Sequence, residues 1–131
     1  LEKQWNSGWK GLISYTLQRT ENEQTGENAT NSPQHLIKGI LTIPLLKDKI
    51  FASAEEFYTS KRILLDETRA DSFFLTNLTL SAHNFIRGLD LSVSIYNVFD
   101  KGYADPASQE HLQNAIEQDG RSYRLKLTYR F

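Results

Sequence analysis

The sequence contains no cysteine and no methionine among its 131 residues. Without cysteine it can form neither a disulfide framework nor a thiolate-ligated metal site. A natural chain of this length without methionine would be unusual, so we expect a piece of a longer polypeptide, cut upstream and running to a native C-terminus. On this interpretation residues 1–8 are a linker or the end of an upstream strand, and residues 9–131 form one domain.

Long apolar runs and a strong charge of one sign are also missing. No apolar stretch approaches the roughly 18 residues of a transmembrane helix, and the mean hydropathy is −0.51. This excludes a membrane-spanning helix but leaves open a transmembrane barrel, whose strands need only alternate. The net charge of −1 offers no clustered basic face, so we expect no nucleic-acid partner.

Six segments alternate apolar and polar residues with the period of two that is typical of β-strands. In the cleanest of them, Tyr123, Leu125, Leu127, Tyr129 and Phe131 alternate with polar and cationic residues. The apolar side of such a strand faces a core in a soluble sheet, whereas in a membrane barrel it faces lipid and the polar side faces a wet lumen. The six segments span residues 9–19, 35–44, 49–59, 72–82, 89–96 and 123–131.

The connections between these segments alternate between long and short. Residues 20–34, 60–70 and 100–119 form long connections, whereas residues 45–48 and 83–88 form short ones. In an up-and-down sheet alternate connections share one end, so we predict that the three long ones emerge together. The predicted fold is all-β: an antiparallel up-and-down meander of about six strands, part of a larger transmembrane β-barrel.

The dimensions and the aromatic residues agree with a barrel wall. A strand of about 10 residues tilted by about 45° spans roughly 25 Å, the height of the apolar band of such a barrel. Aromatic residues are expected at both membrane interfaces. Trp9 and Phe131 are candidates for the rim with the short turns, and Phe74 and Tyr123 for the rim with the long loops.

Several stretches resemble one family. The stretch "SVSIYNVFDKGYADP" resembles the penultimate strand and last loop of TonB-dependent outer-membrane receptors, and "QDGRSYRLKLTYRF" resembles their terminal strand, which ends on phenylalanine. The stretches "SYTLQ", "NSPQHLIKG" and "YTSKR" are similar to earlier strands of the family, in the right order. The resemblance identifies residues 9–131 as the C-terminal β-barrel segment of such a receptor.

The resemblance implies a barrel of about 22 strands with an N-terminal plug and a TonB box, neither of which this chain contains. It implies a receptor in the bacterial outer membrane that takes up scarce nutrients of the iron–siderophore or cobalamin class. The implied partners are outer-membrane lipid, TonB through the missing plug region, and a small-molecule ligand at the external loops. The barrel-assembly machinery would recognise the last strand through Tyr123, Leu125, Leu127, Tyr129 and Phe131.

No cluster of residues predicts catalysis. His35, His83 and His111 lie in different connections or strand ends and lack the spacing of a zinc enzyme. Glu55 and Glu56 are neighbours in a strand, so their side chains point to opposite faces and cannot form an acid–base pair. We expect no enzyme activity, no cofactor and no metal site.

The cationic side of the last strand leaves two interpretations. Arg124, Lys126 and Arg130 line it, and Lys10 and Lys38 are expected near the same surface. They form either a cationic lumen wall that helps an anionic cargo to pass, or solvated polar filling opposite acidic residues that this chain lacks. We favour the second interpretation.

The last long connection also has two interpretations. Asp105 and Pro106 predict the start of a short helix over residues 107–114, with Leu112 and Ile116 on one side. The connection then either packs over itself or closes over a ligand.

Two other functions compete with a receptor. One is a soluble binding module built as a small β-barrel or sandwich, and the other is a non-transporting pore or adhesin. Six strands are fewer than the roughly eight of the smallest common closed barrels. The isolated segment would keep two bare edges and an apolar face, for which a homodimer is the simplest cover.

Overall fold

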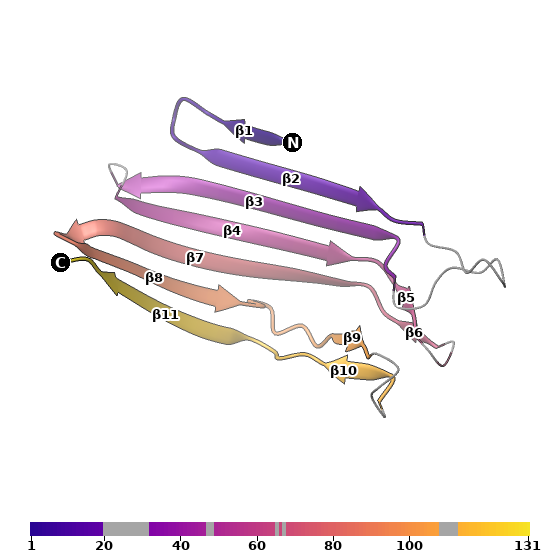
Figure 1. The fold of residues 1–131 in the computed structure, drawn as a ribbon. Helices are drawn as coiled ribbons and strands as arrows, with labels where there is room; N and C mark the ends of the chain where they lie inside the picture. Colours follow the sequence, from indigo (N-terminus) through magenta and orange to yellow (C-terminus); the bar gives the residue numbers. More distant parts are fainter. Residues whose placement is uncertain (20–31, 47–48, 65, 67, 108–112) are drawn as a thin grey trace.

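The computed structural model describes residues 1–19, 32–46, 49–64, 66, 68–107 and 113–131, and this part of the chain contains strands and no helix. Within it, no helix is long and apolar enough to cross a membrane. Seven strands form one antiparallel sheet in the order β1-β2-β3-β4-β7-β8-β11 (Figure 1). They span Glu2–Gln4 (β1), Lys10–Leu17 (β2), His35–Leu46 (β3), Ile50–Thr59 (β4), Phe73–Ile86 (β7), Leu89–Tyr96 (β8) and Ser122–Tyr129 (β11).

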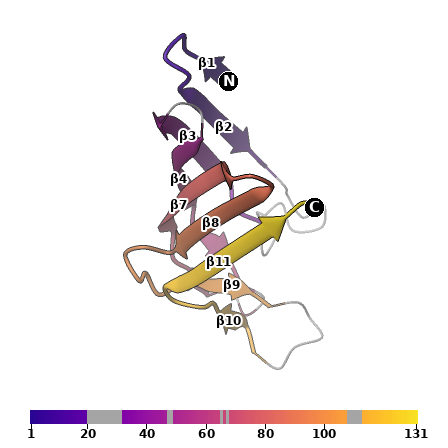
Figure 2. The same ribbon diagram turned by 90° about the vertical axis from the view of Figure 1, so that its left-hand side faces the viewer.

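The sheet is the up-and-down meander that the alternation predicts. All six expected segments are strands, and each long strand pairs with the next one along the chain. A seventh strand, β1, pairs with β2 through residues that precede the expected domain. Figure 2 shows that the strands fan out from β1 to β11, so the sheet is twisted rather than flat.

The two kinds of connection lie at opposite ends of the sheet (Figure 1). The long connection after β4 contains a hairpin of Arg62–Ile63 (β5) and Arg69–Ala70 (β6), and the one after β8 contains a hairpin of Ala104–Pro106 (β9) and Ala115–Glu117 (β10). Both hairpins lie at the end opposite the turn between β7 and β8. The prediction that these two connections share an end is confirmed, whereas most of residues 20–34 lies outside the described residues.

The helix predicted in the last connection is wrong at its start. Asp105 and Pro106 belong to β9, where they pair with Ile116 and Ala115 of β10. The Asp105 carboxylate accepts a hydrogen bond from Arg62 at 2.9 Å instead of capping a helix. Residues 108–112, which contain most of the expected helix, lie outside the described residues.

The register puts apolar side chains on nearly all of one face, while the opposite face mixes polar and charged side chains with apolar ones such as Ile40 and Phe57. Directly paired residues point to the same side of a sheet, and Leu89, Leu91, Val93 and Ile95 pair with Tyr129, Leu127, Leu125 and Tyr123. The prediction that these two sets share a face is therefore confirmed. One row of the apolar face runs Gly11, Leu41, Ala54, Leu78, Ile95, Tyr123 across six strands, and a row of the polar face runs Lys10, Thr42, Ser53, Thr79, Ser94, Arg124.

Neither face of the sheet is covered by a second layer. Tyr123 and Leu125 each expose 71% of their surface on the apolar face. Among the described residues, the buried hydrophobic side chains are Leu64, Phe73 and Ala107, which all lie in or beside the long connections. The sheet is thus built as a wall, and the buried hydrophobic side chains among the described residues lie at its long-loop end.

Candidate functional site

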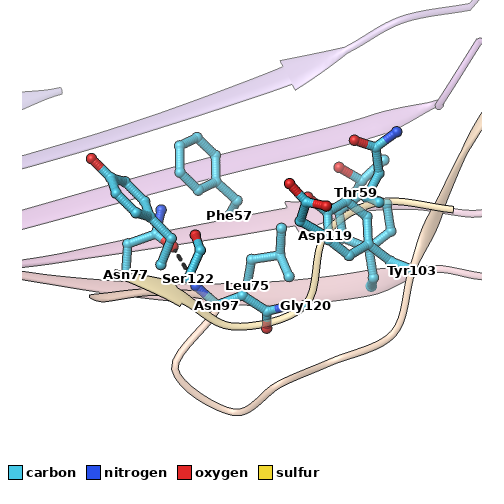
Figure 3. A pocket seen from close by; sticks show the side chains of 12 residues that line it. Phe57, Thr59, Leu75, Asn77, Asn97, Tyr103, Asp119, Gly120 and Ser122 are labelled. Atoms are coloured by element: carbon cyan, nitrogen blue, oxygen red, sulfur yellow. Dashed lines mark hydrogen bonds between the residues drawn. The ribbon is translucent and has the colours of Figure 1, made fainter. Parts of the chain in front are cut away.

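An open pocket of about 430 Å³ lies on the polar face where the sheet meets the long connections (Figure 3). Its floor comes from β4, β7 and β8, and its rim comes from the connection between β8 and β11. Figure 3 shows side chains from both parts around the same space. The lining residues are Phe57, Thr59, Phe73, Leu75, Asn77, Tyr96, Asn97, Tyr103, Gln118, Asp119, Gly120 and Ser122.

Aromatic rings supply the pocket with apolar surface, and three of these rings have a cation beside them. Such cation–ring contacts hold the cationic group near the ring face, where it adds positive potential to an apolar wall. The pairs are Lys38 with Phe57 at 4.8 Å, Arg62 with Phe73 at 5.5 Å and Arg124 with Tyr96 at 5.1 Å, measured from the cationic atom to the ring centroid.

A chain of polar contacts fixes the floor. Lys38 Nζ lies 3.0 Å from a Glu55 carboxylate oxygen, and the other oxygen of Glu55 accepts a hydrogen bond from Asn77 Nδ2 at 3.2 Å. Asn77 Oδ1 in turn accepts from the backbone N–H of Asn97 at 2.9 Å. Because each group is held by its neighbour, the floor keeps its shape without a bound ligand.

Asn97 directs the chain from β8 into the rim. Its φ of 50° lies in the left-handed region that asparagine tolerates. Its side-chain amide binds both the N–H and the C=O of Lys101, each at 2.8 Å, and closes the turn. Asp100 Oδ1 then accepts from the backbone N–H of Arg121 at 2.7 Å, which joins the two ends of the connection.

The two hairpins of the long connections are tied together above the pocket. Arg62 is 8% exposed and donates to Asp105 at 2.9 Å and to the carbonyl of Ala104 at 3.0 Å. Asn114 Nδ2 donates to Asp66 at 2.7 Å. Hydrogen bonds, led by that of the Thr68 hydroxyl, lower the pKa of Asp66 and keep its carboxylate charged.

Tyr103 joins the last connection to the pocket wall. Its ring packs on Phe73 with centroids 4.6 Å apart, and its carbonyl accepts from the N–H of Gln118 at 3.0 Å. Burial raises the pKa of the Tyr103 phenol, and the carboxylates of Asp105 and Asp119 raise it further. The phenol therefore stays a neutral hydrogen-bond donor over the whole physiological range.

This arrangement suits a small ligand with flat unsaturated groups. Ring faces offer stacking surface, Arg124 beside Tyr96 offers a cationic contact, and Asn77, Asp119 and Tyr103 supply hydrogen-bonding groups that fix the ligand's orientation. Within the described residues, no group of three or more side chains is arranged to hold a metal ion directly.

The structure divides the cationic residues predicted on the last strand between two places. Arg124 lies beside Tyr96 at the pocket, whereas Lys126 and Arg130 line a separate groove at the short-turn end. Lys10 and Lys38 point to the same face of the sheet but from β2 and β3. Among the predicted histidines, His35 contacts Tyr15 and His83 lies near Asp90 at the opposite end of the sheet, while His111 is outside the described residues.

The apolar residues predicted on the last strand share one exposed face. Tyr123, Leu125, Leu127 and Tyr129 alternate along β11, and Phe131 follows the end of the strand fully exposed. Their role in barrel assembly stays a prediction.

Sequence reasoning missed the residues that shape the pocket, above all Arg62, Tyr103 and Phe57. Tyr103 stands inside the stretch that carries the family resemblance and Arg62 closes the stretch "YTSKR", so both were available as signals. Their meeting could not be foreseen, because it depends on how two long connections fold over the end of the sheet.

Solved structures of outer-membrane receptors match this chain over nearly its whole length. The siderophore receptor PiuA from Acinetobacter baumannii matches with a TM-score of 0.76 and 19% identity, over 98% of this chain and 20% of that one. The copper transporter OprC matches with a TM-score of 0.80 and 18% identity, over 99% and 22%. The ferripyoverdine receptor of the outer membrane of Pseudomonas aeruginosa matches with a TM-score of 0.76 and 17% identity, over 98% and 18%.

These likenesses establish the fold of the chain. It folds as one segment of the β-barrel of such receptors, and it spans about a fifth of their length, so the barrel is left open. No family model and no curated protein matches the sequence.

Proposed function

We propose that this chain forms part of the barrel wall of a TonB-dependent receptor in the bacterial outer membrane, and that the receptor imports a small nutrient ligand. The single observation that carries the proposal is the separation of the two faces across six strands. An apolar face of leucine, isoleucine, valine and aromatic side chains suits lipid, and the opposite face, which carries most of the serine, threonine and charged side chains together with some apolar ones, suits a wet interior.

The matched structures support this function at the level of the fold. They include receptors described as siderophore and ferripyoverdine receptors and a copper transporter, and none of the names cited is that of an enzyme. Transport needs no catalytic group from the wall, in keeping with our expectation that this chain is not an enzyme. Coupling to TonB would run through a part of the polypeptide outside this chain.

We further propose that the ligand is a metal chelate of the siderophore class, and that the pocket on the polar face is one of its external contacts. The pocket's rings, with Arg124 beside Tyr96, favour a chelate with flat unsaturated arms. A bare copper ion has no flat group to stack on these rings.

The test is ligand uptake by the complete gene product in cells that lack other receptors. A panel of radiolabelled ferric catecholates, ferric hydroxamates and Cu²⁺ identifies the cargo. Phe57→Ala should then raise the half-saturating concentration by about 2- to 10-fold, because a ring contact contributes about 0.5–1.5 kcal/mol.

Phe51→Ala is the matched control. Phe51 lies on the same strand and the same face, but it contacts His83 at the short-turn end, away from the pocket. Uptake of none of the probes, or a protein that stays monomeric in water without detergent, would overturn the receptor in favour of a soluble binding module. If the two substitutions have equal effects on uptake, the pocket does not contact the ligand, but the proposal that the protein is a receptor still stands.

A further inference from the structure

A second groove opens on the polar face at the short-turn end, and it shares no lining residue with the pocket described above. It has a volume of about 280 Å³ between β7, β8 and β11, smaller than the 430 Å³ of the pocket. Its lining combines the hydroxyls of Ser81, Ser92 and Thr128 with the charged groups of Asp90, Lys126 and Arg130.

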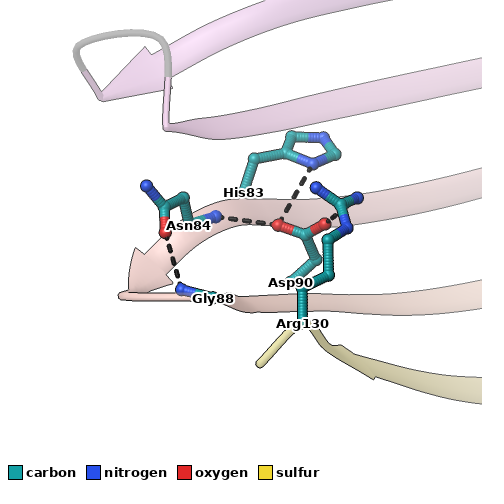
Figure 4. A network of polar contacts seen from close by, with 5 residues as sticks. All are labelled: His83, Asn84, Gly88, Asp90 and Arg130. Atoms are coloured by element: carbon teal, nitrogen blue, oxygen red, sulfur yellow. Dashed lines mark hydrogen bonds and ion pairs between the residues drawn. The ribbon is translucent and has the colours of Figure 1, made fainter.

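Asp90 is already fully engaged by its surroundings. Arg130 donates to Asp90 Oδ2 at 2.8 Å, and the backbone N–H of Asn84 donates to Oδ1 at 2.8 Å. Asn84 is held in turn by the N–H of Gly88, which donates to its Oδ1 at 2.9 Å. Figure 4 shows that His83, with Nδ1 3.9 Å from Asp90 Oδ1, approaches the same carboxylate.

Lys126 lines the same groove but takes no part in this network around Asp90. It forms no ion pair with a carboxylate in the described part of the chain, although Lys38, on the same face, lies 3.0 Å from Glu55. Lys126 lies on the edge strand β11 and pairs in register with Ser92 of β8, so its side chain is on the same face as the Ser92 hydroxyl. With one negative charge against Lys126 and Arg130, the groove carries net positive charge and three hydroxyl donors.

We propose that this groove is an oxyanion site that binds a carboxylate, with Lys126 as the charged partner, the hydroxyls of Ser81, Ser92 and Thr128 as donors, and the Asp90–Arg130 pair as its fixed wall. A compact ammonium surrounded by hydroxyls is suited to a carboxylate of two oxygens, which accepts several hydrogen bonds at once. The carboxylate comes either from an acidic side chain of the polypeptide or from a free small acid. The first source rests on the proposed function, because such a side chain reaches the groove only if the polar face lines an interior.

The experiment uses the complete gene product in detergent and has two arms. In the first, a carbodiimide activates carboxylates and couples them directly to lysine amines in contact with them, and peptide mass spectrometry locates the resulting amides. The Lys38–Glu55 pair is the internal positive control. An amide between Lys126 and an aspartate or glutamate other than Asp90 is expected if the polypeptide supplies the carboxylate.

In the second arm, the thermal unfolding midpoint is compared in malonate and in chloride at equal ionic strength. A rise in the midpoint with malonate is expected if the groove takes a free acid, because a ligand that binds the folded state stabilises it. The rise should be lost in Lys126→Gln, kept in Lys126→Arg, and kept in Lys10→Gln, whose cation lies on the same face but on β2.

Two results would overturn the site. One is an amide between Lys126 and Asp90, which would mean that the groove satisfies its own charge. The other is a Lys126 that stays uncoupled while Lys38 couples to Glu55, together with equal midpoints in malonate and chloride. Neither arm measures uptake, so a failure here is separable from a failure of the receptor function.

Discussion

The two faces of the sheet are made by the same strands and differ in nearly every contact. Glu55 and Glu56 are neighbours in β4, yet Glu55 joins Lys38 and Asn77 on the polar face. Glu56 points to the apolar face, where its carboxylate accepts a hydrogen bond from Thr76 at 2.8 Å. Gly39, its partner in register, has no side chain and leaves room beside it.

The difference shows that position in the alternation, more than residue type, decides the surroundings of a side chain. The carboxylate of Glu55 on the polar face contacts a cation and an amide, whereas the carboxylate of Glu56 on the apolar face contacts a single hydroxyl. Both faces are uncovered, so neither environment is produced by packing against a second layer. It is produced by the side chains that the neighbouring strands present on each face, and we propose that these faces meet lipid on one side and water on the other.

The strongest test of the difference between the two faces is to place one charge on each face of the same strand. Ile13 is 52% exposed on the apolar side near the middle of β2, and Thr16 is exposed on the polar side three residues later. Ile13→Arg should lower the unfolding free energy of the complete protein in phospholipid vesicles by about 2–4 kcal/mol, the cost of arginine near the bilayer midplane.

Thr16→Arg should change that free energy by less than about 0.5 kcal/mol, as surface substitutions usually do. Denaturant titration in vesicles measures both values. Equal losses for the two variants would show that the apolar face does not meet lipid.

A smaller effect is expected from removing the polar pair on the apolar face. Replacing Glu56 by leucine together with Thr76 by valine should stabilise the protein by about 1–2 kcal/mol, because a desolvated polar pair is replaced by apolar groups. Glu55→Leu should have the opposite sign, since Lys38 and Asn77 lose their acceptor, at a cost of about 1–2 kcal/mol.

The unfolding free energy of the single variant Glu56→Leu should lie between those of the double variant and Glu55→Leu, because it leaves the buried hydroxyl of Thr76 without an acceptor. The same titration in vesicles compares the three proteins. A double variant as unstable as Glu55→Leu would mean that Glu56 makes a favourable contact outside this chain.

The alternation made the sheet predictable and left the pocket unpredictable. The faces of Leu125 and Val93 follow from a period of two and from antiparallel pairing, both of which are local properties of the sequence. The pocket depends instead on Arg62 reaching Asp105 across 43 positions of sequence, a contact with no local signal. The expected helix start at Asp105 and Pro106 was wrong for the same reason, because Asp105 is engaged by Arg62, a residue far away in the chain.

The smallest expected effect tests whether the polar face is wet at the pocket. Burial, together with Asp105 and Asp119, raises the pKa of Tyr103 above the ordinary tyrosine value of 10.0. The folded state therefore holds this proton more tightly than the unfolded state does. The stabilisation is fully present below about pH 10 and is lost as the pH rises through the folded pKa.

The tyrosinate absorbance of the wild type minus that of Tyr103→Phe should accordingly have a midpoint above pH 10. Asp119→Asn should move this midpoint down only slightly, because burial is the larger cause and the Asp119 charge is the smaller one. The fall in thermal unfolding midpoint above that pH should be steeper in the wild type than in Tyr103→Phe. A midpoint at or below the value of free tyrosine would mean that water reaches the Tyr103 hydroxyl freely, and that the pocket rim does not close over the ring of Phe73.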